Sequence, residues 1–238
     1  MTESKKKWTL IAIEWIDGSG KWTQVRLLVE NLKKALYDVV VIDFPQYGNN
    51  SAILVEAYLN WKFWTDPNAL CAKIPSAMFA LDRVAAAPQI KKWIEEWKIV
   101  IANRYTTSNM WHQAWKIKKL DERDKFLDWV ENFEYNELQI PRPDAVVYID
   151  MPPEIAQQNV DKKSAEERKY ADWKKRDIHE ADLNHLKNSS EAYRYVAEKY
   201  GWYILNAAPG WVLRSIEENQ QALRDLLSSK KIINAKVA

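Results

Sequence analysis

The chain has 238 residues, of which 47% are hydrophobic and 29% charged, a composition that excludes a disordered or collagen-like protein. Its 35 Lys and Arg residues against 33 Asp and Glu residues leave a formal net charge of +2, which argues against a protein that binds nucleic acid through bulk positive charge. No apolar run approaches the roughly 20 residues of a membrane helix and no signal peptide is visible, so we expect a cytoplasmic protein without a membrane partner.

Short apolar runs alternate along the chain with helical segments. The apolar runs predict strands at residues 9–13, 39–42, 99–102, 145–149 and 203–205. Helical spacing predicts helices at residues 24–34, 51–60, about 70–96 with breaks at Pro75 and Pro88, 120–133, 154–160, 181–200 and 212–227. This alternation is typical of a parallel sheet covered on both faces. We therefore predict one α/β domain over residues 1–238, a three-layer αβα sandwich with a five-stranded parallel sheet and a frayed tail after residue 228.

The glycine and tryptophan counts are unusual. The chain has 5 glycines and 13 tryptophans, whereas glycine normally supplies about 7% of residues. Trp97 and Trp211 stand where a turn would favour glycine, the residue that adopts positive φ without steric cost. We hypothesise that turn and loop glycines have been replaced, many by tryptophan. A naturally tryptophan-rich protein is the alternative.

The strongest motif follows the first predicted strand, where residues 14–23 read Glu-Trp-Ile-Asp-Gly-Ser-Gly-Lys-Trp-Thr. A phosphate-binding loop reads G-x-x-x-x-G-K-[ST], and it places backbone N–H groups and a lysine around phosphates at the start of a helix. Residues 17–21 keep the centre of this pattern between a predicted strand and a predicted helix. A glycine-rich turn without a ligand is the alternative interpretation.

Two tryptophans depart from this pattern. Trp15 occupies the first glycine position, and Trp22 occupies the Ser/Thr position whose hydroxyl normally binds Mg²⁺. Thr23 carries a hydroxyl one residue later, which points elsewhere on a helix. If the first glycine position requires positive φ, an indole there costs on the order of 1–3 kcal/mol of strain.

Further short motifs follow in order. They are Asp-Phe-Pro-Gln-Tyr at 43–47, Phe-Ala-Leu-Asp-Arg at 79–83, Asn-Arg-Tyr-Thr-Thr-Ser-Asn at 103–109, Tyr-Ile-Asp-Met-Pro-Pro-Glu at 148–154, Arg-Asp-Ile-His-Glu at 176–180 and Asn-Ala-Ala-Pro-Gly at 206–210. With these motifs in this order, the chain resembles the thymidylate kinase family of P-loop nucleoside-monophosphate kinases over about residues 8–227. The resemblance implies a P-loop kinase-like fold and phosphoryl transfer from MgATP to dTMP, giving dTDP and ADP for dTTP biosynthesis.

By this resemblance, residues from several motifs bind the acceptor nucleotide. Arg104 grips the phosphate of dTMP, a task that suits a bidentate guanidinium. Phe79 stacks on thymine, and Arg83, on the same helix face, hydrogen-bonds the edge of the base. The other residues that the resemblance places at dTMP are Asp17, Phe44, Pro45, Tyr47, Ser108 and Asn109.

The resemblance also implies an ATP site. Lys21 holds the phosphates, and Asp17 lies near the metal, so that Mg²⁺ is the expected cofactor. The other residues implied at ATP are Gly18, Ser19, Gly20, Thr23, Asn206 and Ala207. The charged segment 161–180 resembles a lid, whose Arg168 and Arg176 join Lys21 and Arg104 as predicted catalytic residues. Members of the family commonly form homodimers, so a second copy of the chain is an expected partner.

Other interpretations stay open at this point. Without the resemblance, Phe79 is more often a core residue, Arg104 is equally the partner of a structural carboxylate, and the lid-like segment is usually a solvated face. A related nucleotide kinase with another acceptor is a second enzyme hypothesis. A catalytically impaired engineered variant, which keeps the fold but has lost ATP binding through Trp15 and Trp22, is a third.

Overall fold

The computed structural model describes residues 9–16, 21–60, 62, 70–114, 116–162 and 183–233, apart from the side chains of residues 21, 158–162 and 183–185. Its strands form one parallel sheet in the order β2-β3-β1-β4-β5. Their bounds are Thr9–Trp15 for β1, Val39–Asp43 for β2, Ile99–Asn103 for β3, Ala145–Asp150 for β4 and Tyr203–Asn206 for β5. The five predicted strands are therefore confirmed, each with a slightly later end.

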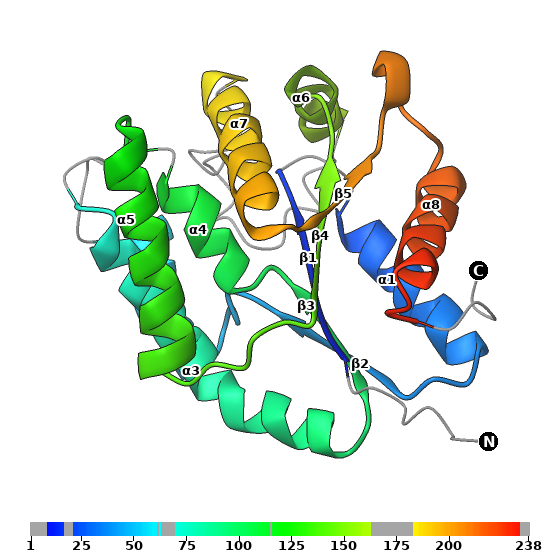
Figure 1. Ribbon diagram of the computed structural model, residues 1–238, viewed down its shortest axis with the longest axis horizontal. Helices are drawn as coiled ribbons and strands as arrows, with labels where there is room; N and C mark the ends of the chain where they lie inside the picture. The colour runs from blue at the N-terminus through cyan, green and yellow to red at the C-terminus, as the bar shows by residue number, and fades with distance from the viewer. Residues whose placement is uncertain are drawn as a thin grey trace.

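Helices cover both faces of the sheet, which confirms the predicted three-layer αβα sandwich (Figure 1). Helices α3, α4, α5 and α7 lie on one side, and α1 and α8 lie on the other. The helices are α1 Lys21–Lys34, α2 Ile53–Leu59, α3 Lys73–Glu95, α4 Thr106–Ala114, α5 Leu120–Glu131, α6 Pro153–Lys162, α7 Leu183–Tyr200 and α8 Ile216–Ser229. Two 3₁₀ turns, η1 Asn50–Ala52 and η4 Pro209–Trp211, and a π-helical segment, η2 Asn132–Glu137, complete the described elements.

Strand β1 is buried on both faces along its whole length. Leu10 packs in a cluster with Ile90 of α3, whereas Ile11 and Ile13 belong to a cluster that includes Leu28 of α1. Successive residues of a strand point to opposite faces, so an apolar run of this kind fits a central strand between two helical layers.

The long helix α3 runs through both of its prolines, so the predicted breaks are wrong. Pro75 lies in the first turn, where backbone N–H groups need no acceptor within the helix. Pro88 lies inside the helix and removes one hydrogen bond, but Ala86 and Ile90 on the same helix are buried in a cluster with Leu10 of β1. Burial of this face therefore outweighs the local cost of the proline.

Two further differences concern a helix that was not predicted and the end of the chain. Helix α4 falls in a segment for which the pattern of apolar residues predicted no element. The chain after residue 228 is packed as far as Ile233, which is buried in the core, so the predicted fraying is wrong for residues 229–233. Residues 234–238 lie outside the described part of the chain.

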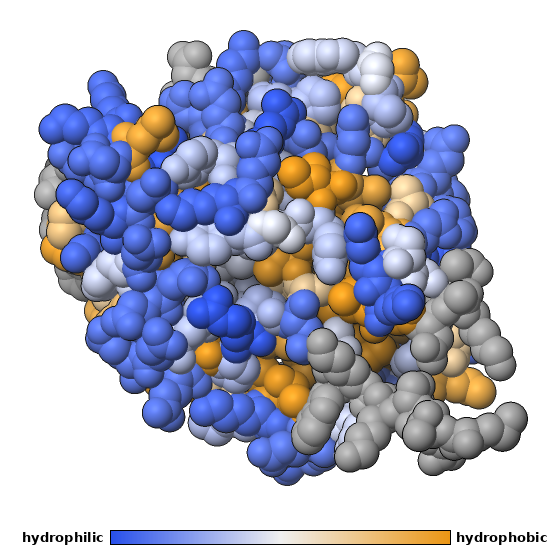
Figure 2. All heavy atoms as spheres, in the orientation of Figure 1, coloured by the Kyte–Doolittle hydropathy of each residue, from blue (hydrophilic) through white to orange (hydrophobic). Residues whose placement is uncertain are grey.

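The surface in the same view is mainly hydrophilic, with separate hydrophobic patches between the polar side chains (Figure 2). None of the helices in the described ranges combines the length and apolar character that a membrane-spanning segment needs.

Several non-glycine residues have left-handed backbone conformations. Trp97 has φ 65° and Trp211 has φ 66°, which confirms that these tryptophans occupy positions that favour glycine. Leu36 has φ 64° directly after α1, where the N–H of Tyr37 donates to the carbonyl of Leu32 at 3.0 Å. This is the residue that follows a helix and is most often glycine.

Replacing such a residue by glycine should stabilise the protein. Leu36 is 91% exposed, so Leu36→Gly loses almost no packing while it relieves the left-handed strain. We expect the free energy of unfolding to rise by about 0.5–1 kcal/mol in urea denaturation. Leu36→Ala is the control, because alanine keeps the β-carbon that causes the strain. A glycine variant no more stable than the alanine variant would contradict this account.

Candidate functional site

The carboxyl ends of the five strands meet at one edge of the sheet, because the strands are parallel. The chain passes from β1 to β2 and β3 on one side and later reaches β4 and β5 on the other. In open α/β sheets, ligands bind outside the carboxyl ends of the strands at the point where the strand order reverses. The residues that end the strands are Trp15, Asp43, Asn103, Asp150 and Asn206.

Arg104 follows β3 at this edge and has a left-handed conformation with φ 63°. Its backbone N–H donates to the carbonyl of Ile13 at 3.2 Å. Its guanidinium lies 5.8 Å from the ring centre of Trp111 and 3.5 Å, through Nη1, from the hydroxyl of Ser108. The side chain of Arg104 is half-buried, so its positive charge at the strand edge remains accessible to an anionic ligand.

A buried ion pair joins α3 to the segment after α5. Arg83 of α3 donates from Nε and Nη2 to the two carboxylate oxygens of Glu134 in η2, both at 2.7 Å. Asn109 of α4 donates from Nδ2 to the same carboxylate at 2.6 Å and to the carbonyl of Ser76 at 2.9 Å. Thr106 adds a bond of 2.8 Å. Glu134 therefore brings the predicted site residues Arg83 and Asn109 together on one carboxylate.

Two polar atoms of this cluster carry no bond within it. Arg83 uses Nε and Nη2 for Glu134, which leaves Nη1 as a donor. Asn109 uses Nδ2 for both of its bonds, which leaves Oδ1 as an acceptor. Phe79, one helical turn before Arg83 on α3, is half-buried and meets the ring of Tyr58 edge-on at 6.3 Å.

The segment after β2 is tied to α3 through Asp82. This carboxylate accepts from the backbone N–H of Gln46 at 2.8 Å and from the hydroxyl of Ser51 at 2.6 Å. Phe44 is buried and its ring lies 5.7 Å from that of Tyr105, while Tyr47 is exposed. The predicted residues Phe44, Pro45 and Tyr47 thus lie on a loop fixed between α3 and the start of α4.

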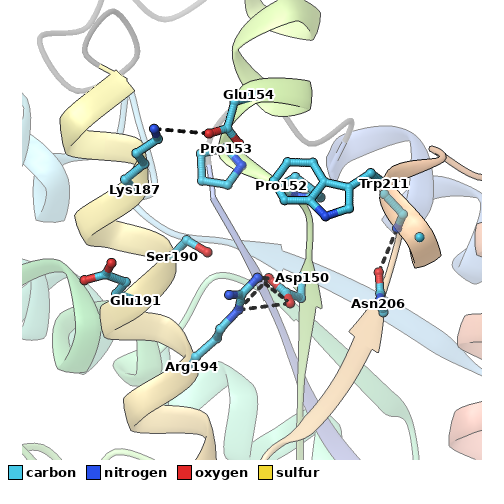
Figure 3. Close-up of a pocket in the computed structure, with 12 residues that line it drawn as sticks. Asp150, Pro152, Pro153, Glu154, Lys187, Ser190, Glu191, Arg194, Asn206 and Trp211 are labelled. Atoms are coloured by element: carbon cyan, nitrogen blue, oxygen red, sulfur yellow. Dashed lines mark hydrogen bonds and ion pairs between the residues drawn. The ribbon is translucent and has the colours of Figure 1, made fainter.

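On the other side of β1, a cleft of about 370 Å³ opens between β4, α7 and the segment after β5 (Figure 3). Arg194 of α7 forms an ion pair with Asp150 at 3.0 Å, and Lys187 forms one with Glu154 at 3.2 Å. The hydrogen bonds that Arg194 donates to Asp150 raise the pKa of Arg194. The pKa of the Glu154 carboxyl is lowered, mainly by the hydrogen bond that it accepts from its own backbone N–H. The hydrogen bond and positive charge of Lys187 lower it further.

The predicted residues Asn206 and Ala207 lie beside this cleft. Oδ1 of Asn206 accepts from the N–H of Ala208 at 2.9 Å, and the N–H of Ala207 donates to the carbonyl of Asp150 at 2.8 Å. Trp211 borders the cleft opposite α7 (Figure 3). The strand-end loop is therefore held in place by backbone and amide hydrogen bonds, with an aromatic surface at its rim.

The phosphate-loop residues are described only in part. Residues 17–20, with Asp17, Gly18, Ser19 and Gly20, lie outside the described residues, as do Arg168 and Arg176 of the lid-like segment. Lys21 begins α1, Trp22 is exposed, and Thr23 follows within the first turn.

Trp15 differs from the expectation of strain. It ends β1 in extended conformation, opposite Ile149 of β4, and is fully buried. Positive φ is therefore not required at this position, and the indole packs within the hydrophobic core. Its Nε1 is buried with no hydrogen-bond partner among the described residues.

Sequence reasoning missed Glu14, the most highly connected side chain at the strand edge. Its Oε1 accepts from the backbone N–H of Tyr105 at 3.0 Å and from the hydroxyl of Thr107 at 2.6 Å. Its Oε2 accepts from Ser108 at 2.8 Å and lies 2.8 Å from the hydroxyl of Tyr193. A carboxylate inside an otherwise apolar strand was the signal that could have identified it, since buried charges need partners.

Comparisons with known proteins show which family the chain is similar to. A family model described as thymidylate kinase matches residues 13–221. Thymidylate kinase of Mycobacterium tuberculosis is 33% identical over 149 residues, which cover 62% of this chain and 68% of the relative. A probable thymidylate kinase of Saccharolobus solfataricus is 27% identical over 201 residues, covering 84% and 88%. The fold matches that of thymidylate kinase from Candida albicans with a TM-score of 0.68 at 19% identity, over 94% of this chain and 93% of the other.

The buried Arg83–Glu134 pair leads to a stability prediction. Glu134→Leu leaves the Arg83 charge buried without its partner, and we expect urea denaturation to give a loss of about 3–5 kcal/mol. The double variant Arg83→Met, Glu134→Leu removes both charges and should lose much less. Glu30→Ala, which breaks an exposed pair with Arg26, is the control and should cost less than about 1 kcal/mol. A double variant as unstable as the single one would refute the role of the unpaired charge.

Proposed function

This chain belongs to the thymidylate kinase family, and on that premise we propose that it transfers a phosphoryl group from ATP to the phosphate of dTMP, giving dTDP and ADP. Phosphoryl transfer asks little covalent chemistry of the protein, which must position the two nucleotides in line and neutralise charge. One side of the strand edge binds the acceptor nucleotide, and the other side binds ATP.

The acceptor phosphate binds at Arg104. A guanidinium at the carboxyl end of β3 can form two parallel hydrogen bonds with phosphate oxygens. The half-buried setting of Arg104 supports this role, because an ion pair is stronger where water is partly excluded. Ser108 lies next to it on the first turn of α4.

The thymine base binds at the Arg83–Glu134–Asn109 cluster, and this cluster is the observation that carries the proposal. Arg83 has Nη1 left as a donor, and Asn109 has Oδ1 left as an acceptor. Thymine presents the complementary pair, the O4 acceptor and the N3–H donor, whereas cytosine presents the opposite pattern at these positions. Glu134 holds both side chains on one carboxylate, so the donor and the acceptor are presented in a fixed relation. Phe79, one turn away on α3, supplies the stacking face.

ATP binds along the phosphate loop and the cleft of Figure 3, with Lys21 at the phosphates and Asn206 and Ala207 near the base. The aromatic rim at Trp211 and the polar walls of the cleft suit a base with one stacked face. The lid residues Arg168 and Arg176 close over the phosphates and stabilise the charge that develops during transfer.

Magnesium accompanies ATP in this proposal. Within the described residues no cluster of three His, Cys, Asp or Glu side chains forms a metal cage. Mg²⁺ usually takes one or two carboxylates together with water and phosphate oxygens. Asp17 is one such carboxylate. When bound, the ion neutralises phosphate charge.

The remaining proposals concern assembly and location. Ile53 and Leu54 of α2 and Ile74 and Leu81 of α3 are exposed apolar side chains on adjacent helices. We propose that this face, which we call the α2–α3 face, joins two copies in a homodimer, since apolar surface of this kind favours association. The chain forms one kinase domain and works in the cytoplasm.

Activity is tested by ADP formation from MgATP that depends on dTMP. We expect the chain to be active and Arg104→Ala to lower kcat/KM for dTMP by about 100-fold, because a charged hydrogen-bond pair to phosphate is lost. Arg26→Ala, on an exposed part of α1, is the matched control and should change nothing beyond about twofold.

The tryptophans of the phosphate loop decide how a negative result is interpreted. Trp22→Thr restores the hydroxyl next to Lys21 and leaves the core intact, whereas Trp15→Gly would remove a fully buried side chain. Activity in Trp22→Thr alone would identify this chain as an impaired copy of a dTMP kinase. Absence of dTMP-dependent turnover in both proteins would overturn the proposed function.

Acceptor choice tests the base-binding cluster. In a panel of monophosphates we expect dTMP and dUMP to be used at least 100-fold more efficiently than dCMP, since dCMP leaves buried polar groups facing groups of like kind. The order dTMP above dUMP would reflect contact with the methyl group. Efficient use of dCMP or of a purine monophosphate would instead favour a related nucleotide kinase with another acceptor.

A further inference from the structure

Glu14 is a fully buried carboxylate to which the proposed reaction gives no task. Four groups lie within hydrogen-bond distance of its carboxylate. They are the backbone N–H of Tyr105 and the hydroxyls of Thr107, Ser108 and Tyr193. The side chain is therefore saturated with donors, and it has no open surface on which a nucleotide could bind. Any effect on catalysis must pass through the groups that it holds.

The first of these groups is the backbone beside Arg104. Arg104 has φ 63°, a conformation that a residue with a β-carbon keeps only when its surroundings enforce it. Its own N–H is bound by the carbonyl of Ile13 at 3.2 Å, and the next N–H, that of Tyr105, is bound by Glu14 at 3.0 Å. Two consecutive residues of β1 thus hold the peptide units on both sides of the Arg104 α-carbon.

The second group is the hydroxyl of Ser108. Its single proton is donated to Glu14, at 2.8 Å from Oε2, so its oxygen faces other donors as an acceptor. Nη1 of Arg104 is the donor found there, at 3.5 Å. The carboxylate therefore orients the oxygen that Nη1 of Arg104 meets in this weak contact.

We propose that Glu14 is a positioning residue that aims the Arg104 guanidinium at the acceptor phosphate. This inference rests on the proposed function in one respect, the assignment of Arg104 to that phosphate. It differs from a purely structural role, in which loss of Glu14 would weaken every part of the acceptor site alike.

The test compares the binding of dTMP with that of thymidine, which lacks the phosphate, by calorimetric titration of the full chain. The ratio of the two affinities measures how well the phosphate is held. In Glu14→Gln we expect this ratio to fall about tenfold, a loss of roughly 1.4 kcal/mol, while the affinity for thymidine stays within about twofold. Thr107→Val is the matched control, since it removes one hydroxyl bond to the same carboxylate and leaves the bonds from Tyr105 and Ser108 in place. Its ratio should stay unchanged.

A cycle with Arg104→Ala separates the two hypotheses. Once the guanidinium is gone, Glu14→Gln should have no further effect on the ratio, because both changes act through one group. If Arg104→Ala itself keeps the preference for dTMP, the assignment of Arg104 in the proposed function fails. If Arg104→Ala removes the preference but Glu14→Gln weakens dTMP and thymidine equally, the positioning role of Glu14 fails.

Glu14→Asp guards against a variant that does not fold. The shorter carboxylate keeps its charge but cannot reach Tyr105 and Tyr193 together, so the same fall in the ratio is expected. If neither variant folds, Glu14 is a structural residue of the core and the inference is overturned.

Discussion

The first turn of α4 is held between two buried carboxylates, and the proposed acceptor side of the site depends on this arrangement. Tyr105, Thr107 and Ser108 donate to Glu14, while Thr106 and Asn109 donate to Glu134. Five consecutive residues therefore contact one carboxylate or the other. The negative charges also lie at the amino end of the helix, where its dipole stabilises them.

These two carboxylates come from distant parts of the fold. Glu14 belongs to the central strand β1, and Glu134 belongs to the π-helical segment that follows α5. Each is costly to bury alone, but each is surrounded by donors, so the desolvation is offset by hydrogen bonds and, for Glu134, by Arg83. The arrangement makes α4 a rigid support whose position relative to the strand edge is set from two sides.

Much of the fold could be predicted from the sequence. The apolar runs located all five strands, because a buried parallel strand leaves a continuous signal, and the alternation with helices indicated the layers. The errors occurred where burial overrode local preference. Helix α3 tolerates Pro88, and Ile233 anchors a tail for which fraying was predicted.

The site was predicted less completely, for a physical reason. Ordered motifs predicted Arg83, Arg104 and Asn109 as site residues, but no local pattern indicates that Arg83 and Asn109 share Glu134. Pairing across 51 residues of sequence is decided by packing alone. Trp15 shows the converse, because a motif position that suggested strain proved to be an extended residue inside the core.

The contact between Glu14 and Tyr193 joins residues 179 positions apart and closes the strand edge late in the chain. Contacts of such long sequence separation are entropically expensive to form early in folding. During synthesis, β1 and α4 emerge well before α7, so the carboxylate waits for its last hydroxyl partner until most of the chain has left the ribosome. The surroundings of Glu14 are thus completed only when nearly the whole chain has been made.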